Sequence, residues 1–265
     1  MNISFRHETP ADYYAVEEMT REAFWYYWED DRRICDEHML VNRLRCVAAF
    51  VPELDYVAEM DGRIIGHIIF TKSRIKADDG RSYETLTFGP LTVMPEFQNK
   101  GVGKALMLHS FDKARQLGYR AVIIFGHPDY YPRVGFRRAV EFGFTTVTGI
   151  TFDAFMALPL YDGALNGIHG TVHLNFVYEQ LTQKDALEFD KRFPPKAPHV
   201  PVPISALLER LEPDAAKAVQ RLGFKNALML RSRSEREMLL QPGIDAKAIE
   251  TIRATLLEQG FRWGK

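Results

Sequence analysis

Apolar and polar positions form three different patterns in the N-terminal part of the chain. Residues 3–6 alternate with a period of two, which is typical of a short strand. Residues 9–12 (Thr-Pro-Ala-Asp) predict a helix start, because a capping hydroxyl, a first-position proline and an acidic side chain all suit that end of a helix. Residues 36–50 carry apolar side chains at helical spacing and predict a second helix.

A run of strands follows these helices. Residues 55–60, 63–75 and 83–94 each predict a strand. Asp61-Gly62 is a strong two-residue hairpin turn between the first two strands, and residues 77–80 (Ala-Asp-Asp-Gly) form a second turn. This part of the chain is therefore predicted to be an antiparallel meander.

The pattern then changes to a helix followed by a buried strand. Residues 101–117 have helical periodicity and end at Gly118, which suits a helix C-cap. Residues 121–125 are continuously apolar, as in a strand buried on both faces. Because strand, helix and strand in this order form a crossover unit, the strands at 83–94 and 121–125 are predicted to be parallel. Later strands are predicted, the first two as a pair, at 142–147, 154–160 and 176–178.

A proline-dense segment at 193–203 separates this region from the C-terminal part. It excludes regular helix or central strand and predicts a semi-rigid linker. The residues beyond it predict helices at 204–211, 214–222, 235–240 and 246–260. The predicted domains are 1–180, a proline-rich linker at 181–203, and a helical domain at 204–265.

Composition places the chain among ordinary globular proteins. Of 265 residues, 46% are apolar and 26% charged, and the net charge of -1 gives no whole-chain signal for nucleic acid or a membrane surface. Two cysteines, Cys35 and Cys46, are too few for a disulfide framework, so we expect a reducing, cytoplasmic location. No segment has the apolar length of a signal peptide or membrane span, so we expect a soluble protein without a membrane partner.

Cys35, His38 and Cys46 raise the question of a zinc site. A structural zinc ion needs four ligands, and both a fourth ligand and paired spacing are missing. We therefore expect two half-buried thiols on a helix and no metal.

The clearest chemical motif is residues 98–105 (Gln-Asn-Lys-Gly-Val-Gly-Lys-Ala), at a predicted strand-to-helix turn. Gly101 and Gly103 let the backbone approach a ligand because they lack a Cβ. Consecutive N–H groups at a helix N-terminus, with Lys100 and Lys104 beside them, form an anion site that suits a pyrophosphate. The motif lacks the Gly-Lys-Ser/Thr ending of a P-loop and the third glycine of a dinucleotide-binding fold.

These residues resemble the GNAT superfamily of N-acetyltransferases, whose signature is Gln/Arg-x-x-Gly-x-Gly/Ala. Gln98, Gly101 and Gly103 stand at the matching positions. Residues 131–136 (Tyr-Pro-Arg-Val-Gly-Phe) are similar to the family's Tyr-x-x-x-Gly-Phe segment after its fifth strand. Two motifs in the expected order make the resemblance specific, and it spans about residues 3–160.

The resemblance implies an α/β (α+β) fold, with a mixed, mostly antiparallel central sheet flanked by helices, joined here to a small all-α C-terminal domain. It also implies an acetyl-CoA-dependent N-acyltransferase, in which acetyl-CoA is the acyl-donor substrate. In such an enzyme a primary amine of a small molecule or peptide attacks the thioester carbonyl directly in a ternary complex, and CoA leaves as a thiolate.

The resemblance further implies the site residues. The fourth strand separates from the fifth, its exposed backbone pairs with the pantetheine arm, and one of its N–H groups stabilises the oxyanion. Pro90, which has no N–H, is consistent with a bulge or break in pairing there. Tyr131 matches the residue that protonates the leaving sulfur, a role that suits a phenol with a pKa of about 10. The implied donor-binding residues are Leu91, Thr92, Val93, Gln98, Asn99, Lys100, Gly101, Val102, Gly103 and Lys104.

The general base is not assigned. Several members of the family carry a glutamate on the fourth strand, but the corresponding residue here is Thr87. Glu84, Glu22, His127 and a backbone-held water are the alternatives.

Residues 24–31 (Phe-Trp-Tyr-Tyr-Trp-Glu-Asp-Asp) combine aromatic and acidic side chains. They either receive a cationic amine through ring faces and carboxylates, or form an amphipathic helix with an aromatic core face. The second interpretation is favoured because several of these side chains must be core. The acceptor side is expected to involve the first two helices and the last strand pair.

Residues 204–265 are mildly basic, with eleven Lys/Arg against eight Asp/Glu. Residues 240–252 resemble a helix-hairpin-helix and, more widely, the C-terminal domain of the bacterial RNA polymerase α subunit. In such modules a Gly-x-Gly hairpin binds a DNA phosphate, but the second glycine is Asp245 here, and Ala248 replaces the usual serine or threonine. DNA binding, protein docking or homodimerisation, and a purely structural role remain open.

Two classes of function follow from these motifs. The leading one is the N-acetyltransferase, which the presence of Tyr131 favours. The alternative is a non-catalytic acyl-CoA-binding regulator that acts through residues 204–265 on DNA or a protein partner, which the missing strand glutamate leaves open.

Overall fold

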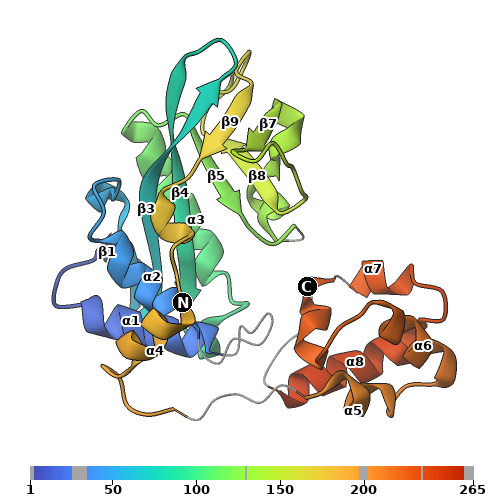
Figure 1. Ribbon diagram of the computed structural model, residues 1–265. Coiled ribbons are helices and arrows are strands. Elements are labelled where there is room, and N and C mark those ends of the chain that lie inside the picture. The colour runs from blue at the N-terminus through green and yellow to red at the C-terminus, as the bar shows by residue number, and fades with distance from the viewer. Residues whose placement is uncertain (1–2, 26–34, 129, 197–201, 234, 260–265) are drawn as a thin grey trace. The chain divides into compact units, whose positions relative to one another are not determined.

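A computed structural model describes residues 3–25, 35–128, 130–196, 202–233 and 235–259 (Figure 1). Contacts within the chain define two compact units. Unit 1 comprises Met1–Phe24 and Cys35–Pro194, and unit 2 includes Pro195–Lys265.

In the described residues, unit 1 is built on a nine-stranded sheet with the order β1-β2-β3-β4-β5-β8-β6, with β9 against β3 and β7 against β9. Its strands are β1 (Ser4–His7), β2 (Tyr56–Met60), β3 (Arg63–Ala77), β4 (Ser82–Val93), β5 (Ala121–Phe125), β6 (Arg137–Arg138), β7 (Phe144–Thr146), β8 (Phe155–Pro159) and β9 (Gly170–His173). Only the pairs β4–β5 and β7–β9 are parallel among these strands. The predicted mixed, mostly antiparallel sheet flanked by helices is confirmed, including the parallel crossover from β4 to β5.

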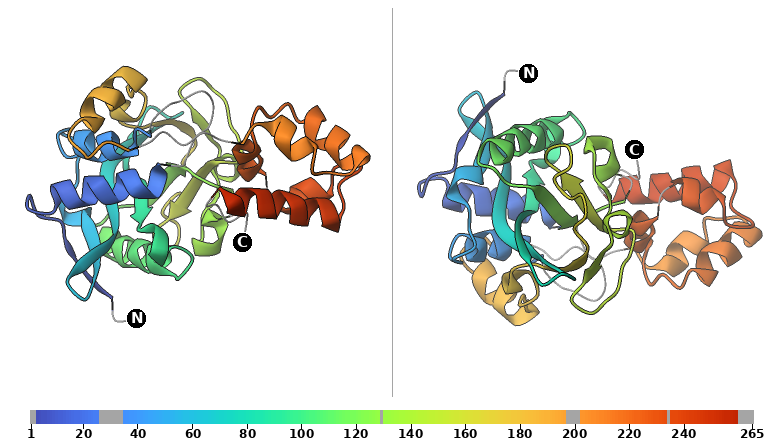
Figure 2. Two further views of the ribbon diagram at one scale, coloured as in Figure 1. Left: turned by 90° about the horizontal axis from the view of Figure 1, so that it is seen from below. Right: turned by 90° about the horizontal axis from the view of Figure 1, so that it is seen from above.

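Helices cover both faces of this sheet. They are α1 (Tyr13–Phe24), α2 (Glu37–Leu44), α3 (Val102–Gln116) and α4 (Gln183–Asp190). In the views of Figure 2, α2 and α4 lie on one side of the sheet and α3 lies on the other.

Successive residues of β3 show how one strand serves both faces. Phe70 points towards α3, where its ring lies 6.5 Å from that of Phe111. Ile69 points the other way and packs with Leu40 and Leu44 of α2. Because side chains alternate along a strand, a strand buried on both faces shows an unbroken apolar run rather than an alternating one.

The predicted pairing of residues 142–147 with 154–160 is wrong. Both segments contain strands, but β8 pairs with β5 and β6, while β7 pairs with β9. Gly170 at the start of β9 makes this arrangement possible, because a Cβ there would lie 2.2 Å from the Lys76 carbonyl oxygen of β3.

Residues 176–178, predicted as a strand, form one turn of 3₁₀ helix instead. The Asn175 side chain accepts a hydrogen bond of 3.0 Å from the Val177 amide, which closes the turn locally. The expected strand is therefore replaced by a capped turn.

Part of the segment predicted as a linker, 181–203, is helical in the structure. Thr182 caps α4 by accepting from the Asp185 amide, and α4 occupies residues 183–190. At the end of α4, Asp190 forms a bidentate ion pair with Arg21 of α1, at 2.5 and 2.9 Å. The first part of the expected linker therefore belongs to unit 1, and residues 197–201 of it lie outside the described residues.

Unit 2 is helical around its own apolar core. Its helices are α5 (Ile204–Leu208), α6 (Pro213–Arg221), α7 (Glu235–Leu239) and α8 (Ala246–Glu258). Ala218, Val219, Leu230 and Ile252 are among its buried side chains. Across the described part of the chain, every helix is too short or too polar to cross a lipid bilayer.

Candidate active site

The strands β4 and β5 separate shortly after they meet. Leu86 opposite Val122 is the one register pair between them in the described residues. One residue further along β4, the Thr87 hydroxyl donates to the Ile123 carbonyl oxygen at 2.9 Å. Beyond this point β4 pairs only with β3 among the described strands, so its other edge is open.

The backbone N–H and C=O groups point to alternate sides along the open part of β4. The Met94 amide donates to the Ile65 carbonyl of β3, and Thr92 lies opposite His67 of the same strand. Because hydrogen-bonding direction alternates from residue to residue, Leu91 and Val93 direct their amide and carbonyl groups to the open edge. The backbone of Thr92 faces β3 instead.

The side chain of Thr92 is also buried. Its hydroxyl lies 3.0 Å from that of Thr20 on α1. Of the three strand residues expected to bind the donor through their backbone, the geometry thus favours Leu91 and Val93.

A tight loop joins the open edge to α3. The Gln98 side chain donates from Nε2 to the Val93 carbonyl oxygen at 3.0 Å and closes the loop. Asn99 and Gly101 have φ angles of 59° and 85°, in the left-handed region. The loop can therefore turn sharply into α3.

The first turn of α3 presents unpaired amides. Gly101 caps the helix without a side-chain hydrogen bond, and the Ala105 amide donates to its carbonyl oxygen. The N–H groups of Val102, Gly103 and Lys104 precede this bond and have no partner within the helix. With no acidic residue in this turn, the amides and the positive helix end form an anion site.

Gly103 brings this anion site against the open strand. A Cβ at Gly103 would lie 3.3 Å from Val93 Cγ2, 3.5 Å from Leu91 Cδ2 and 3.5 Å from Tyr130 Oη. The residues expected at 91–93 and 98–104 therefore lie together, and only a glycine fits this contact without displacing a neighbour.

Tyr131 lies across the opening between the two strands. A Cβ at Gly126, directly after β5, would be 2.3 Å from Tyr131 Cε2, so the ring covers this glycine. The ring centroid is also 5.9 Å from that of Phe88 on β4. The expected acid thus contacts residues of both diverging segments.

The structure excludes Glu84 as the base. Glu84 is seven residues before Leu91 on the same strand, which is about 23 Å at the usual rise per residue. Its carboxylate is exposed and pairs with Lys72 at 3.3 Å. Thr87, at the expected glutamate position, is buried with its hydroxyl on Ile123.

Glu22 and His127 receive no base role from the geometry. Glu22 lies half-buried on α1, and His127 is exposed after β5, where its carbonyl accepts from the Tyr130 and Tyr131 amides. The general base therefore stays unassigned.

The acceptor side is only partly visible. Residues 26–31 of the aromatic and acidic stretch at 24–31 lie outside the described residues.

A pair of aromatic rings that the sequence did not single out lies next to the opening. Phe125, at the end of β5, is 51% exposed, and its ring lies 5.3 Å from that of Phe152, which is 40% exposed, with the two planes tilted by 52°. Since Ile124 faces α3, Phe125 points to the opposite face of the sheet.

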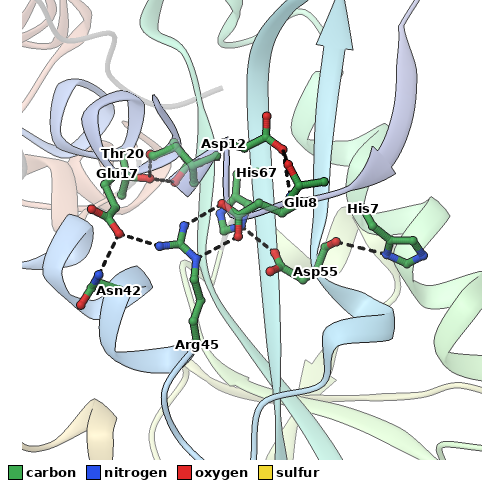
Figure 3. Close-up of polar contacts among 12 residues, drawn as sticks. His7, Glu8, Asp12, Glu17, Thr20, Asn42, Arg45, Asp55 and His67 are labelled. Carbon is green, nitrogen blue, oxygen red and sulfur yellow. Dashed lines mark hydrogen bonds and ion pairs between the residues drawn. The ribbon is translucent and has the colours of Figure 1, made fainter. Parts of the chain in front are cut away.

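A buried charged cluster lies beneath α1 and α2 (Figure 3). Arg45 forms a fork on Glu8, at 2.6 and 2.8 Å, and reaches Glu17 at 2.6 Å. His67 Nε2 lies 2.8 Å from Asp55 Oδ1. This cluster could not be predicted from the sequence, because its members come from separate elements.

The cluster is an ion-pair network rather than a metal centre. Glu8, Asp55 and His67 place ligand atoms within 4.8 Å of one another, the one such group found among the described residues. Both Glu8 oxygens, however, accept from the Arg45 guanidinium, whose positive charge would repel a cation.

Burial controls protonation in this network. It raises the pKa of Glu8 to about 7 and that of Asp55 to about 6, and it lowers the pKa of His67 to about 4. Three buried carboxylates share one buried guanidinium, so the network retains a proton well above the pH at which free carboxyl groups ionise.

The three residues considered for zinc lie in different environments, and the expected pair of half-buried thiols on a helix is wrong, because Cys35 is buried before α2 and Cys46 is exposed after it. Cys35 Sγ lies 3.5 Å from His38 Nδ1, while Cys46 is exposed and bonds to the Asn42 carbonyl. His38 Nε2 lies 3.1 Å from Asp190, and burial raises the pKa of the Cys35 thiol. The thiol is therefore held protonated in the core.

Comparison with known proteins identifies a family model that fits this region. Residues 7–142 match the model of the acetyltransferase (GNAT) family. The matched range contains the open strand, the anion site and Tyr131.

Two relatives come from Escherichia coli K12, and both are described as uncharacterized N-acetyltransferases. YhbS is 28% identical over 167 residues, which covers 63% of this chain and 93% of YhbS. YjhQ is 38% identical over 86 residues, which covers 32% of this chain, and the chain spans 46% of the length of YjhQ.

Two solved structures share the fold. The E. coli YhbS crystal structure in complex with CoA has a TM-score of 0.59 at 27% identity and covers 69% of this chain and 94% of its own. A GNAT family acetyltransferase from Brucella melitensis in complex with acetyl-CoA has a TM-score of 0.52 at 25% identity, and the match covers 67% of this chain and 98% of that protein.

Proposed function

The chain belongs to the acetyltransferase (GNAT) family, and from this we propose that it transfers an acetyl group from acetyl-CoA to a primary amine of a small molecule or peptide. The observation that carries the proposal is the contact of Gly103 with Leu91 and Val93, which joins an anion site to an open strand edge. The pyrophosphate of acetyl-CoA suits the anion site, and its amide-bearing pantetheine arm suits the open strand edge.

The donor would lie along these two features. Its pyrophosphate would accept from the amides at 102–104, with Lys100 and Lys104 beside it. Its pantetheine arm would pair with the backbone of Leu91 and Val93, as an added strand does. The CoA and acetyl-CoA complexes of the two related structures support this assignment.

The reaction would be a direct transfer within a ternary complex. The amine nitrogen attacks the thioester carbonyl carbon, a new C–N bond forms, and the C–S bond breaks. A backbone N–H of Leu91 or Val93 at the open edge would donate to the oxyanion. Tyr131 would give its proton to the departing CoA thiolate, and the amine would lose its proton to water, since no residue is assigned as base.

The C-terminal unit would serve in contacts rather than in chemistry. We propose that residues 204–265 form a helix-hairpin-helix-like domain that contacts a protein, including a second copy of the chain, rather than DNA. Asp245 accepts from the Ala248 amide at 2.8 Å and so places its own carboxylate where a phosphate would bind. Lys247 and Arg253 are paired with Glu212 and Glu235, which lowers the local positive charge.

The domain boundaries and a cytoplasmic location stay predictions. The cysteine content is the argument for the cytoplasm, and both cysteines are free thiols.

The test of the proposed function is CoA release by the full chain from acetyl-CoA, measured with a panel of primary amines and peptides. We expect amine-dependent thiol release and an acetylated product of the corresponding mass. Replacement of Gly103 by Val should abolish donor binding, whereas Leu117→Val, at an exposed position at the far end of α3, should not. Acetyl-CoA binding without transfer to any amine would favour the non-catalytic regulator instead.

A further inference from the structure

Two adjacent tyrosines reach different parts of the candidate site. The rings of Tyr130 and Tyr131 are 5.2 Å apart and nearly perpendicular, at 84°. The Tyr131 ring covers Gly126 after β5, whereas the Tyr130 hydroxyl lies over Gly103 in the first turn of α3. Only Tyr131 belongs to the motif that indicated the acid.

The Tyr130 hydroxyl is available to a ligand. It makes no hydrogen bond with any described residue, although the side chain is half-buried against the main core of unit 1. The hydroxyl oxygen itself is not fully buried, so water reaches it in the free protein, and a bound acceptor oxygen would take the place of that water.

The charge around this hydroxyl favours an anionic partner. Burial raises the pKa of Tyr130 above its usual range, and nearby Arg133 only partly opposes this, so the phenol keeps its proton and acts as a donor. The first turn of α3 holds no acidic side chain. Its amides at 102–104 lie at the positive end of the helix, which attracts an anion.

We propose that the Tyr130 hydroxyl donates a hydrogen bond to a pyrophosphate oxygen of the acyl-CoA donor, beside the amides of the α3 first turn. This role rests on the proposed function and adds a donor-binding residue to it. Tyr130 would act on donor affinity, while Tyr131 would act on turnover. Two neighbouring residues of the same type therefore give a matched pair for the test.

The experiment compares Tyr130→Phe and Tyr131→Phe in the full chain. Calorimetry gives the Kd for CoA, and steady-state kinetics give kcat and KM for acetyl-CoA. A hydrogen bond to a charged oxygen is lost in Tyr130→Phe, so we expect its Kd and KM to rise by about 10-fold or more with kcat little changed. Tyr131→Phe should instead lower kcat and leave the Kd for CoA within about twofold. Tyr161→Phe, at a 43% exposed site, controls for the substitution itself.

A truncated donor identifies the atom that Tyr130 contacts. S-acetylpantetheine has the thioester and the amide arm but no pyrophosphate. We expect kcat/KM for this donor to be the same in the wild type and in Tyr130→Phe. An equal loss with both donors would place the hydroxyl on the arm and overturn the proposal, as would an unchanged Kd for CoA.

Failure of the two proposals can be told apart. If the wild type binds CoA and Tyr130→Phe binds it equally well, only the role of Tyr130 is lost. If the wild type binds no CoA, the proposed function is lost and this role with it. Thermal melting of each variant checks that the loss of one hydroxyl leaves the fold intact.

Discussion

The Thr87 hydroxyl donates to the carbonyl oxygen of Ile123 where β4 and β5 part. A side chain here takes the place of the main-chain hydrogen bonds that would otherwise continue the parallel pairing. We expect Thr87→Val to keep the shape of the side chain and to lower the free energy of unfolding by about 1 kcal/mol.

The same substitution should also lower kcat, because the separation of the strands positions the open edge. Thr85→Val is the matched control. Thr85 is buried on the same strand and bonds to Ser73 at 2.9 Å, within the paired part of the sheet. Urea unfolding should show a similar loss of unfolding free energy for both variants. Equal effects of the two substitutions on kcat would contradict a special role for Thr87.

Gly126 should be essential to the position of Tyr131. A methyl group at this site would lie 2.3 Å from the Tyr131 ring, so Gly126→Ala must displace the ring. We expect kcat to fall about 100-fold, as in Tyr131→Phe, with little change in CoA affinity. The double variant should be no slower than Tyr131→Phe alone, and additive losses would show that Gly126 acts by another route.

Asp190 should matter far more to stability than its place near the end of α4 suggests. Its carboxylate pairs with Arg21, which is 3% exposed, and with His38, which is fully buried. Asp190→Ala removes two charge-assisted hydrogen bonds from a buried guanidinium, so it should cost about 2–3 kcal/mol of unfolding free energy. Asp185→Ala, which breaks the exposed pair with Arg43 on the same helix, should cost less than about 1 kcal/mol in the same urea titration.

The buried cluster around Arg45 should make stability depend on pH. Burial raises the pKa of Glu8 from 4.5 to about 7, so between these values the folded state holds a proton that the unfolded state has lost. Stability therefore falls as the pH rises through this window, at about 1 kcal/mol per pH unit from this group. His67, whose pKa burial lowers, acts in the opposite direction, so the effect is read as a difference.

That difference is the unfolding free energy of the wild type minus that of Glu8→Gln, measured from pH 5 to pH 8. We expect it to decline up to about pH 7 and then to level off. Parallel curves for the two proteins would mean that Glu8 is already ionised at pH 5.

The donor half of the site could be predicted because its requirements are local. The left-handed φ of Gly101 and the close approach at Gly103 restrict single positions to glycine, and such restrictions are visible in a sequence. Tyr131 followed by Gly-Phe is equally compact. The helices and the meander followed from periodicity, which is also a local property.

The features that escaped prediction depend on contacts between distant segments. Glu8, Arg45 and His67 each resemble ordinary surface residues in the sequence, and only the fold shows that they are buried together. The pairing of β9 with β3 was hidden for the same reason, because a short segment beginning at Gly170 has no periodicity to indicate its neighbour. Local patterns specify elements, whereas the choice of partner is decided by the whole core.

The open amides at 102–104 have a consequence for anyone who handles this protein. A helix end that binds phosphate groups through main-chain N–H groups does not distinguish a nucleotide from dissolved sulfate or inorganic phosphate. In phosphate buffer we therefore expect the proposed donor to compete with that ion, so that its apparent affinity becomes partly a property of the solution. Preparations exchanged into buffers of large organic anions, or of none, should give the tighter and more reproducible value.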